Sequence, residues 1–75
     1  LRKGSKIMKI TLKDEYIKLG QALKAAGLVE NGAQAKEVIQ EGQVLVNGET
    51  DLRRGRKLYA GDTVTFNGEE IEIED

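Results

Sequence analysis

The sequence predicts an α+β fold in which two short helices pack on a small, mainly antiparallel β-sheet with an added N-terminal strand. Two observations predict it. Apolar residues recur every three or four positions in the first half of the chain and every two positions after residue 42, and two predicted strands are each followed by an Asn-Gly pair. The chain has 75 residues, a length typical of one domain. We interpret residues 1–7 as an N-terminal extension or tag and residues 8–75 as that domain.

The added strand is predicted directly after the basic N-terminal residues. Its apolar and polar residues alternate in the order Met8, Lys9, Ile10, Thr11 and Leu12. This period of two is typical of a strand with one buried side.

Two helices are predicted next, over residues 18–26 and 33–41. Gly27 and Gly42 follow them, at the position where glycine commonly ends a helix, and Asn31 is a suitable N-cap for the second. Apolar residues spaced three or four apart form the inner faces. These are Leu19, Leu23, Ala26, Ala35, Val38 and Ile39.

Two hairpins account for most of the predicted sheet. Asn47-Gly48 and Asn67-Gly68 each follow a short apolar or alternating run. Asn-Gly favours a tight hairpin turn because both residues tolerate a positive φ. Gly61-Asp62 marks the turn into the second hairpin, and alternation assigns one set of residues to the core: Val64, Phe66, Ile71 and Ile73.

The composition excludes most catalytic chemistry. The chain has no Cys and no His, so it lacks thiolate nucleophiles, disulfides, the usual general base and the commonest metal ligand. We therefore expect no enzymatic activity, no cofactor and no metal ion. No apolar run is long enough for a membrane span, and we expect a cytoplasmic protein without membrane contact.

The charges are segregated along the chain although the net charge is only −1. Residues 2–24 contain seven bases and two acids, and the last seven residues contain five acids. A positive face can therefore meet a polyanion despite a slightly negative total, because charges within a Debye length of about 8 Å decide the contact. Four bases cluster in a further segment: Arg53, Arg54, Arg56 and Lys57.

This basic segment is the strongest functional signal in the composition. Arginine can grip phosphate oxygens with two parallel hydrogen bonds, and Gly55 within the segment allows a close backbone approach. The alternative is a solvated loop whose charges pair with Glu49, Asp51 and their neighbours. With Phe66 assigned to the core, two tyrosines remain as stacking platforms, so phosphate and shape contacts should dominate any nucleic-acid binding.

Three stretches of the sequence carry a family resemblance. They are KLGQALKAAGL (residues 18–28), AQAKEVIQEGQVLVNG (residues 33–48) and YAGD (residues 59–62). The chain resembles the S-four RNA-binding domain, also called the αL motif, and within it the small stand-alone bacterial members of the YaaA/YbcJ type.

The resemblance implies a non-catalytic module that binds structured RNA, commonly ribosomal RNA, during ribosome assembly or translation. It places RNA contacts on the two helices and an adjoining loop. The chain departs from the family pattern at Gly32 and Glu37, where many members carry a base. The residues expected to contact RNA are Lys18, Lys24, Gln34 and Lys36 by family position, and Arg53, Arg54, Arg56 and Lys57 by charge.

A second function class is compatible with the same fold. The acidic C-terminal strand or an exposed sheet edge could bind a protein partner, which would make the chain an interaction adaptor. We expect the RNA-binding function, with structured ribosomal RNA or ribosomal particles as partners and a monomeric protein.

Overall fold

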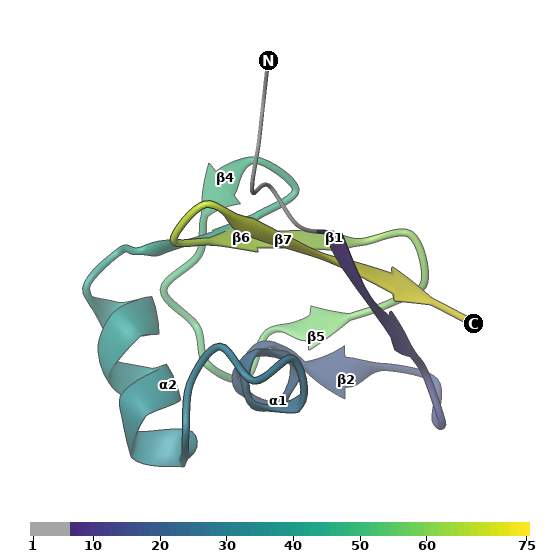
Figure 1. Ribbon diagram of the computed structural model, residues 1–75, viewed down its shortest axis with the longest axis horizontal. Coiled ribbons are helices and arrows are strands. Elements are labelled where there is room, and N and C mark those ends of the chain that lie inside the picture. Colours follow the sequence, from purple (N-terminus) through teal and green to yellow (C-terminus); the bar gives the residue numbers. More distant parts are fainter. Residues whose placement is uncertain (1–6) are drawn as a thin grey trace.

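The computed structural model describes residues 7–75, which fold into two helices and seven short strands (Figure 1). The expected extension over residues 1–7 lies outside the described residues except for Ile7, the first residue of a strand. The elements are, in chain order, β1 (Ile7–Thr11), β2 (Ile17–Lys18), α1 (Leu19–Ala25), α2 (Gly32–Gln40), β3 (Val44–Val46), β4 (Glu49–Thr50), β5 (Lys57–Leu58), β6 (Thr63–Phe66) and β7 (Glu69–Glu74).

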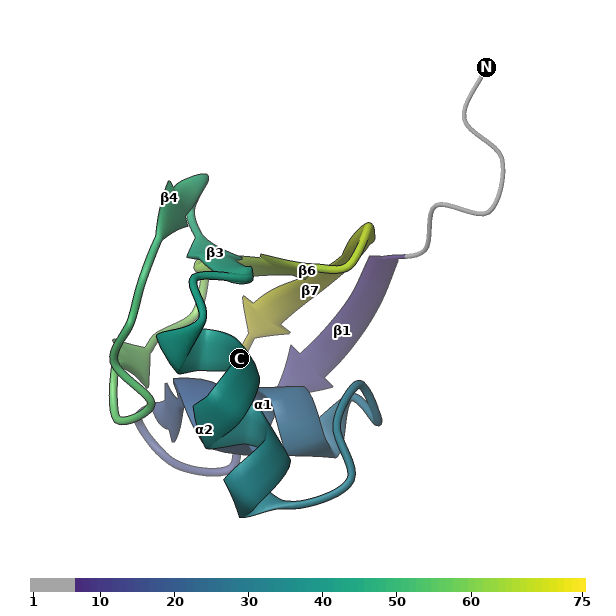
Figure 2. The ribbon, with the colours of Figure 1, turned by 90° about the vertical axis from the view of Figure 1, so that its left-hand side faces the viewer.

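Five of the strands form one sheet in the order β1-β7-β6-β3-β4. Three of its four pairings are antiparallel, and β1 joins the edge by pairing parallel to β7, with Met8 opposite Ile71. Both helices lie on one face of this sheet, and no helix of residues 7–75 covers the other face (Figures 1 and 2). The predicted α+β class, with its mainly antiparallel sheet and added N-terminal strand, is confirmed.

The Asn-Gly turns have the backbone that the hairpins require. Asn47 and Gly48 have φ values of 53° and 84°, and Asn67 and Gly68 have 55° and 80°. Positive φ at both central residues gives the turn a twist that matches the flanking strands. These turns join β3 to β4 and β6 to β7.

The helices also have the capping residues that the sequence predicts, at the start of α2 and after the last turn of both. The side chain of Asn31 accepts a hydrogen bond from the N–H of Gln34 at 2.8 Å and so caps α2. Gly27 and Gly42 follow the helices with φ values of 76° and 80°. Their left-handed backbone allows the chain to leave the helix without a side-chain clash.

The core lies between the helices and the sheet. Leu19, Leu23 and Ile39 from the helices are fully buried, as are Val64 and Ile71 from the sheet. Phe66 is half-buried and packs against this cluster. The predicted core face is therefore confirmed.

One element has no counterpart in the sequence prediction. Strands β2 and β5 form a separate two-stranded ladder, with Ile17 opposite Leu58 and Lys18 opposite Lys57. Leu58 is fully buried. Each strand has two residues, which is too short for a period of two to appear in the sequence.

Neither helix in the described part of the chain could cross a membrane.

Candidate functional site

A shallow cleft of about 290 Å³ lies where α1, the start of α2 and the segment between β4 and β5 meet. Three of the residues that line it are basic and three are glycines. The bases come from separate parts of the chain: Lys18, Lys24 and Arg54. The glycines are Gly20, Gly32 and Gly55.

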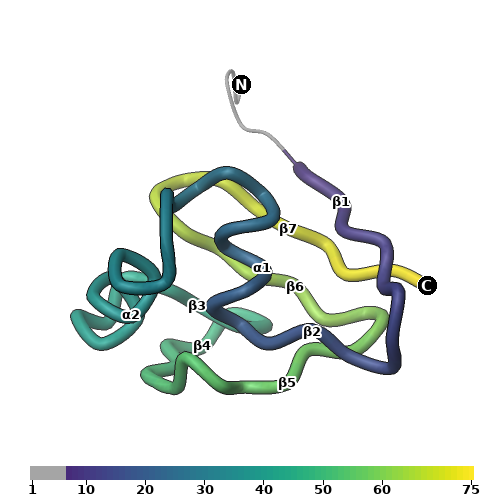
Figure 3. The backbone as a smooth tube through the Cα atoms, turned by 90° about the horizontal axis from the view of Figure 1, so that it is seen from below, coloured from purple at the N-terminus to yellow at the C-terminus, as the bar shows by residue number. Residues whose placement is uncertain are grey.

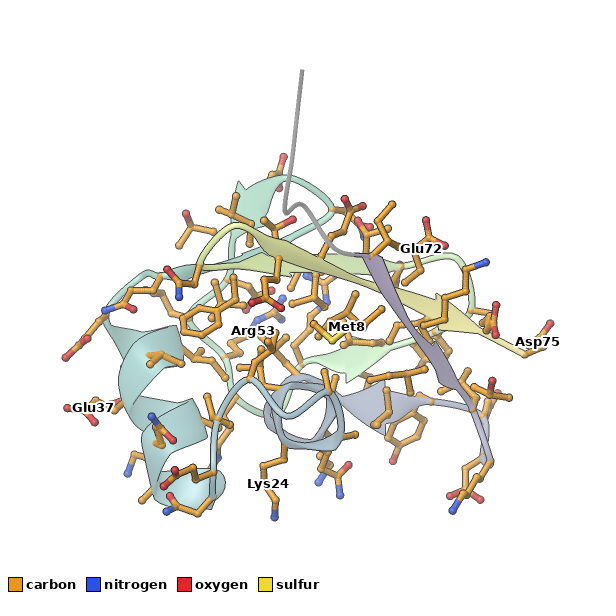
Figure 4. The ribbon with its side chains drawn as sticks, in the orientation of Figure 1. Met8, Lys24, Glu37, Arg53, Glu72 and Asp75 are labelled. Atoms are coloured by element: carbon orange, nitrogen blue, oxygen red, sulfur yellow. The ribbon has the colours of Figure 1, made fainter. Side chains whose placement is uncertain are left out.

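One lysine of the cleft lies on α1 and the other lies just before it. Lys24 lies one turn after Gly20, so both are on the same side of the helix. Figure 4 shows the Lys24 side chain pointing away from the sheet, into solvent. Lys18 directly precedes the helix, and its N–H donates to Oε1 of Gln21 at 3.2 Å, which steadies the first turn.

The segment that carries Arg54 is docked onto the N-terminus of α1. The N–H of Leu19 donates to the carbonyl of Arg56 at 2.8 Å, and the N–H of Gly20 donates to the carbonyl of Arg54 at 3.0 Å. Such N–H groups have no partner within their own helix. Figure 3, in which the backbone is seen from below, shows that the chain between β4 and β5 runs beside β2 and the start of α1.

Gly20 makes this close approach possible. A Cβ built at Gly20 would lie 2.7 Å from Cγ of Arg54, a separation that real Cβ atoms essentially never show. The aliphatic stem of Arg54 therefore lies directly on the helix backbone. Glycine at this position brings an exposed guanidinium to the cleft.

The other two arginines of the segment are bound to one carboxylate. Asp51 is buried, with 7% of its surface exposed. Its Oδ1 accepts from Nε of Arg53 at 3.1 Å, and its Oδ2 accepts from Arg53 at 2.9 Å and from Arg56 at 2.6 Å. Hydrogen bonds from the Arg53 side chain, and then from its backbone N–H and from Arg56, hold the pKa of Asp51 well below its usual range, although burial acts in the opposite direction.

The predicted pairing of the loop arginines with nearby acidic residues therefore occurs for two of the three arginines. Arg53 and Arg56 pair with Asp51, as in the solvated-loop alternative, but within residues 7–75 Arg54 takes part in no ion pair. The three arginines are chemically equivalent in the sequence. The fold gives them different surroundings.

Lys57 lies apart from the cleft and contacts an aromatic pair. Its Nζ lies 4.8 Å from the ring centroid of Tyr16, a distance typical of a cation–π contact. The rings of Tyr16 and Tyr59 are 5.9 Å apart. Lys57 is the first residue of β5, so its side chain belongs to the small ladder.

The two α2 residues differ in their relation to the cleft. Lys36 is exposed and lies one turn after Gly32, on the side of the helix that borders the cleft. Gln34 is exposed elsewhere on the helix, and its Oε1 accepts from the N–H of Glu30 at 2.7 Å. Glu37 points away from the molecule (Figure 4). Gln34 thus has a structural contact, while Lys36 lies on the cleft side of α2 but is not among the residues that line the cleft.

Three glutamates of β7, at positions 70, 72 and 74, lie on the side of the molecule opposite the cleft. Glu72 lies on the uncovered face of the sheet, between its strand partners Lys9 and Thr63, and Figure 4 shows it on the far side from Lys24. The alternating residues Ile71 and Ile73 are buried against the helices. The sheet therefore separates the bases of the cleft from an acidic outer face, formed by Glu70, Glu72 and Glu74.

Some residues of the site could not be recognised from the sequence. Gly20 and Gly32 lie within helices, where glycine usually indicates only a weak helical position. The sequence indicates Asp51 only as a partner for loop charges, because its burial arises from the fold. In the described residues, no three Asp, Glu, Cys or His side chains come together as a metal site would require.

Comparisons with known proteins agree with this architecture. The S4 domain family model matches residues 10–74. A protein of Bacillus subtilis (strain 168) with the name "Probable ribosome maturation protein RlbA" is 51% identical over 59 residues, which cover 79% of this chain and 83% of that protein. YbcJ of Escherichia coli (strain K12) is 43% identical over 61 residues, which cover 81% of this chain and 87% of YbcJ.

A solved structure is similar over the whole chain. The solution structure of YbcJ from Escherichia coli superimposes with a TM-score of 0.73 at 37% identity, covering 100% of this chain and 96% of YbcJ. That structure is described as revealing an αL motif involved in RNA-binding. The level of identity and the coverage indicate common descent as well as a common fold.

Proposed function

The chain belongs to the S4 domain family, and from this premise we propose that it binds structured ribosomal RNA through the cleft between α1, α2 and the basic segment. It is a non-catalytic member of the family, because RlbA of Bacillus subtilis and YbcJ of Escherichia coli, which it matches over most of their length, are described by ribosome maturation or RNA binding rather than by a reaction.

The observation that carries the proposal is the meeting of Lys18, Lys24 and Arg54 at one cleft. All three side chains are exposed, so their charges are available to a ligand. Gly32 and Gly55, where an added Cβ would meet nothing within 4 Å, leave room for a backbone phosphate to approach the protein main chain. Cationic side chains around a concave surface suit a polyanion of fixed shape, such as a folded RNA.

Two considerations favour structured ribosomal RNA: the first concerns the ribosome, and the second distinguishes folded from single-stranded RNA. The RlbA relative carries a name that refers to ribosome maturation. The cleft itself presents charge without aromatic rings, whereas readers of single strands usually stack bases on exposed rings. We propose that the protein acts as a monomer in the cytoplasm, on ribosomal RNA or ribosomal particles.

Single-lysine variants test the proposal with a matched control. Lys24→Ala removes a charge from the cleft, and Lys9→Ala removes the same charge from the outer face of the sheet. Binding of the purified proteins to ribosomal RNA fragments is measured at several salt concentrations. Lys24→Ala should weaken binding about tenfold and reduce the slope of log K against log salt by roughly 0.7–0.9, because one phosphate contact is lost.

Two results would contradict the proposal. Equal effects of Lys24→Ala and Lys9→Ala would mean that binding depends only on total charge. Failure of the parent protein to bind ribosomal RNA would exclude the function itself.

The protein-adaptor alternative is supported by the acidic outer face. Glu70 and Glu72 are half-buried and Glu74 is exposed on a sheet face that no helix covers. Recovery from cells separates the two functions. Co-purified RNA that nuclease removes supports RNA binding, and a protein partner that survives nuclease and is lost on Glu72→Lys supports the adaptor.

A further inference from the structure

We propose that Asp51 is a positioning residue for RNA binding: its carboxylate holds Arg53 and Arg56 so that the segment between β4 and β5 presents Arg54 to the cleft. This inference rests on the proposed function and deepens it. It assigns different tasks to three neighbouring arginines that composition alone treats as equal.

The first step of the argument is the burial of Asp51. It is the one charged residue within residues 7–75 that is buried. Burying a carboxylate is costly unless it is paired and hydrogen-bonded. Asp51 accepts from the Arg53 backbone N–H at 2.9 Å and from both arginine side chains, so both of its oxygens are satisfied.

The second step is that Asp51 connects the sheet to the basic segment. Its own N–H donates to the carbonyl of Val44 on β3 at 3.2 Å. Its carboxylate reaches forward to Arg53 and Arg56, which flank Arg54 and Gly55. The residues on both sides of Arg54 are therefore fixed relative to the sheet.

The third step is the attachment of the same residues to α1. The carbonyl of Arg56 accepts from the N–H of Leu19, and the carbonyl of Arg54 accepts from the N–H of Gly20, both in the first turn of the helix. A segment held at one end by a buried carboxylate and along its length by the helix has little freedom. Arg54 then meets RNA without first losing conformational entropy, and such preorganisation increases affinity.

The fourth step is the use of the arginine donors. Arg53 gives Nε and one terminal nitrogen to Asp51, which is the two-nitrogen edge that grips a carboxylate or a phosphate. Arg56 gives a terminal nitrogen and is only partly exposed. Arg54 keeps its whole guanidinium for the cleft.

The sign of one substitution distinguishes this role from a simple charge effect. Asp51→Asn removes a negative charge next to four bases, so electrostatics alone predicts tighter binding to a polyanion. Loss of positioning predicts weaker binding, because an amide cannot bind two guanidinium groups as a carboxylate does. Glu49→Gln is the matched control, since Glu49 is exposed on β4 two residues away.

The experiment measures binding to a ribosomal RNA fragment for the parent, Asp51→Asn and Glu49→Gln, at several salt concentrations. Asp51→Asn should bind at least about fivefold more weakly, with a log–log salt slope lower by roughly 0.7–0.9 from the lost Arg54 contact. Glu49→Gln should bind as tightly as the parent or more tightly. Circular dichroism and thermal unfolding establish that each variant is folded at the binding temperature.

A second variant covers the case in which Asp51→Asn does not fold. Arg53→Lys combined with Arg56→Lys keeps every charge but removes the planar forks that bind Asp51. It should also bind more weakly, with a lower salt slope. In either variant, parent-like affinity with an unchanged slope would overturn the positioning role.

The outcomes separate this inference from the function on which it rests. If the parent binds and Lys24→Ala weakens binding while Asp51→Asn does not, the positioning role is wrong and the RNA-binding function stands. If the parent does not bind ribosomal RNA, both are wrong.

Discussion

Gly20 and Arg54 are in direct contact: the N–H of Gly20 donates to the carbonyl of Arg54 at 3.0 Å, and a Cβ at Gly20 would lie 2.7 Å from Cγ of Arg54. This contact joins residues 34 positions apart in the sequence. It connects α1, which carries Lys24 and directly follows Lys18, to the segment that carries the arginine of the cleft. The absence of a side chain at Gly20 thus determines where the Arg54 side chain lies.

Gly20→Ala should therefore weaken RNA binding severalfold. The new methyl group would displace the Arg54 stem from the helix. The free energy of unfolding should change by no more than about 1 kcal/mol, because alanine's higher helix propensity offsets the displacement. Binding to a ribosomal RNA fragment and urea unfolding measure the two effects separately.

A double-mutant cycle with Arg54→Ala provides the control. If Gly20→Ala acts by moving Arg54, it should have little effect on RNA affinity once Arg54 is alanine. Additive losses would mean that Gly20 acts on binding by another route.

The contribution of Asp51 to stability should depend on pH in one direction. Its pKa is lowered in the folded protein, so the stabilisation is complete above the unfolded-state value of about 3.9 and is lost as pH falls toward the folded-state value. The difference in unfolding free energy between the parent and Asp51→Asn should be constant from about pH 5 to 8 and should shrink below about pH 4. Urea unfolding across this range measures it, and a difference that grows on acidification would contradict the ion pairing.

Asn31→Ala should destabilise the domain by about 1 kcal/mol. The substitution removes the side-chain oxygen that accepts from the N–H of Gln34 and caps α2. Asn31→Asp keeps an acceptor at this position and serves as the control. Chemical denaturation of the three proteins tests the cap, and equal stability of Asn31→Ala and the parent would exclude it.

Asn47→Ala should lower stability by about 1–3 kcal/mol without changing the RNA affinity of the folded protein. Asn47 has a φ of 53°, its Oδ1 accepts from the N–H of Thr63 at 3.0 Å, and its Nδ2 donates to Asp62 at 3.1 Å. Both roles are structural. Thermal unfolding measures the loss, and weaker RNA binding by the folded variant would instead indicate a contact role for this turn.

The sequence predicts elements whose signals are local. Asn47-Gly48 and Asn67-Gly68 define the two hairpins because positive φ is a property of these residue types themselves. Asn31 marks the start of α2 for a similar reason, since its side chain bonds to a backbone group three residues away. Alternation in β6 and β7 assigns the core face because side chains in a strand point to opposite sides in turn.

Features that depend on contacts between residues far apart in the sequence cannot be predicted from such local signals. The sequence predicts β1 and β7 as strands but not their parallel pairing, which joins residues about sixty positions apart. The ladder between Ile17 and Leu58 joins two-residue strands and has no pattern of its own. Likewise, the basic residues of the site are evident from composition, whereas the separate surroundings of Arg53, Arg54 and Arg56 arise from the burial of Asp51.

Crosslinking in cells followed by sequencing of the attached RNA tests the central claim most directly. It compares the parent with a variant in which Lys18, Lys24 and Arg54, the three bases of the cleft, are all alanine. We predict that the parent recovers fragments of ribosomal RNA and that the variant, present at equal amounts and folded, loses them. Recovery of the same fragments by both proteins, or of no ribosomal RNA by the parent, would contradict the account.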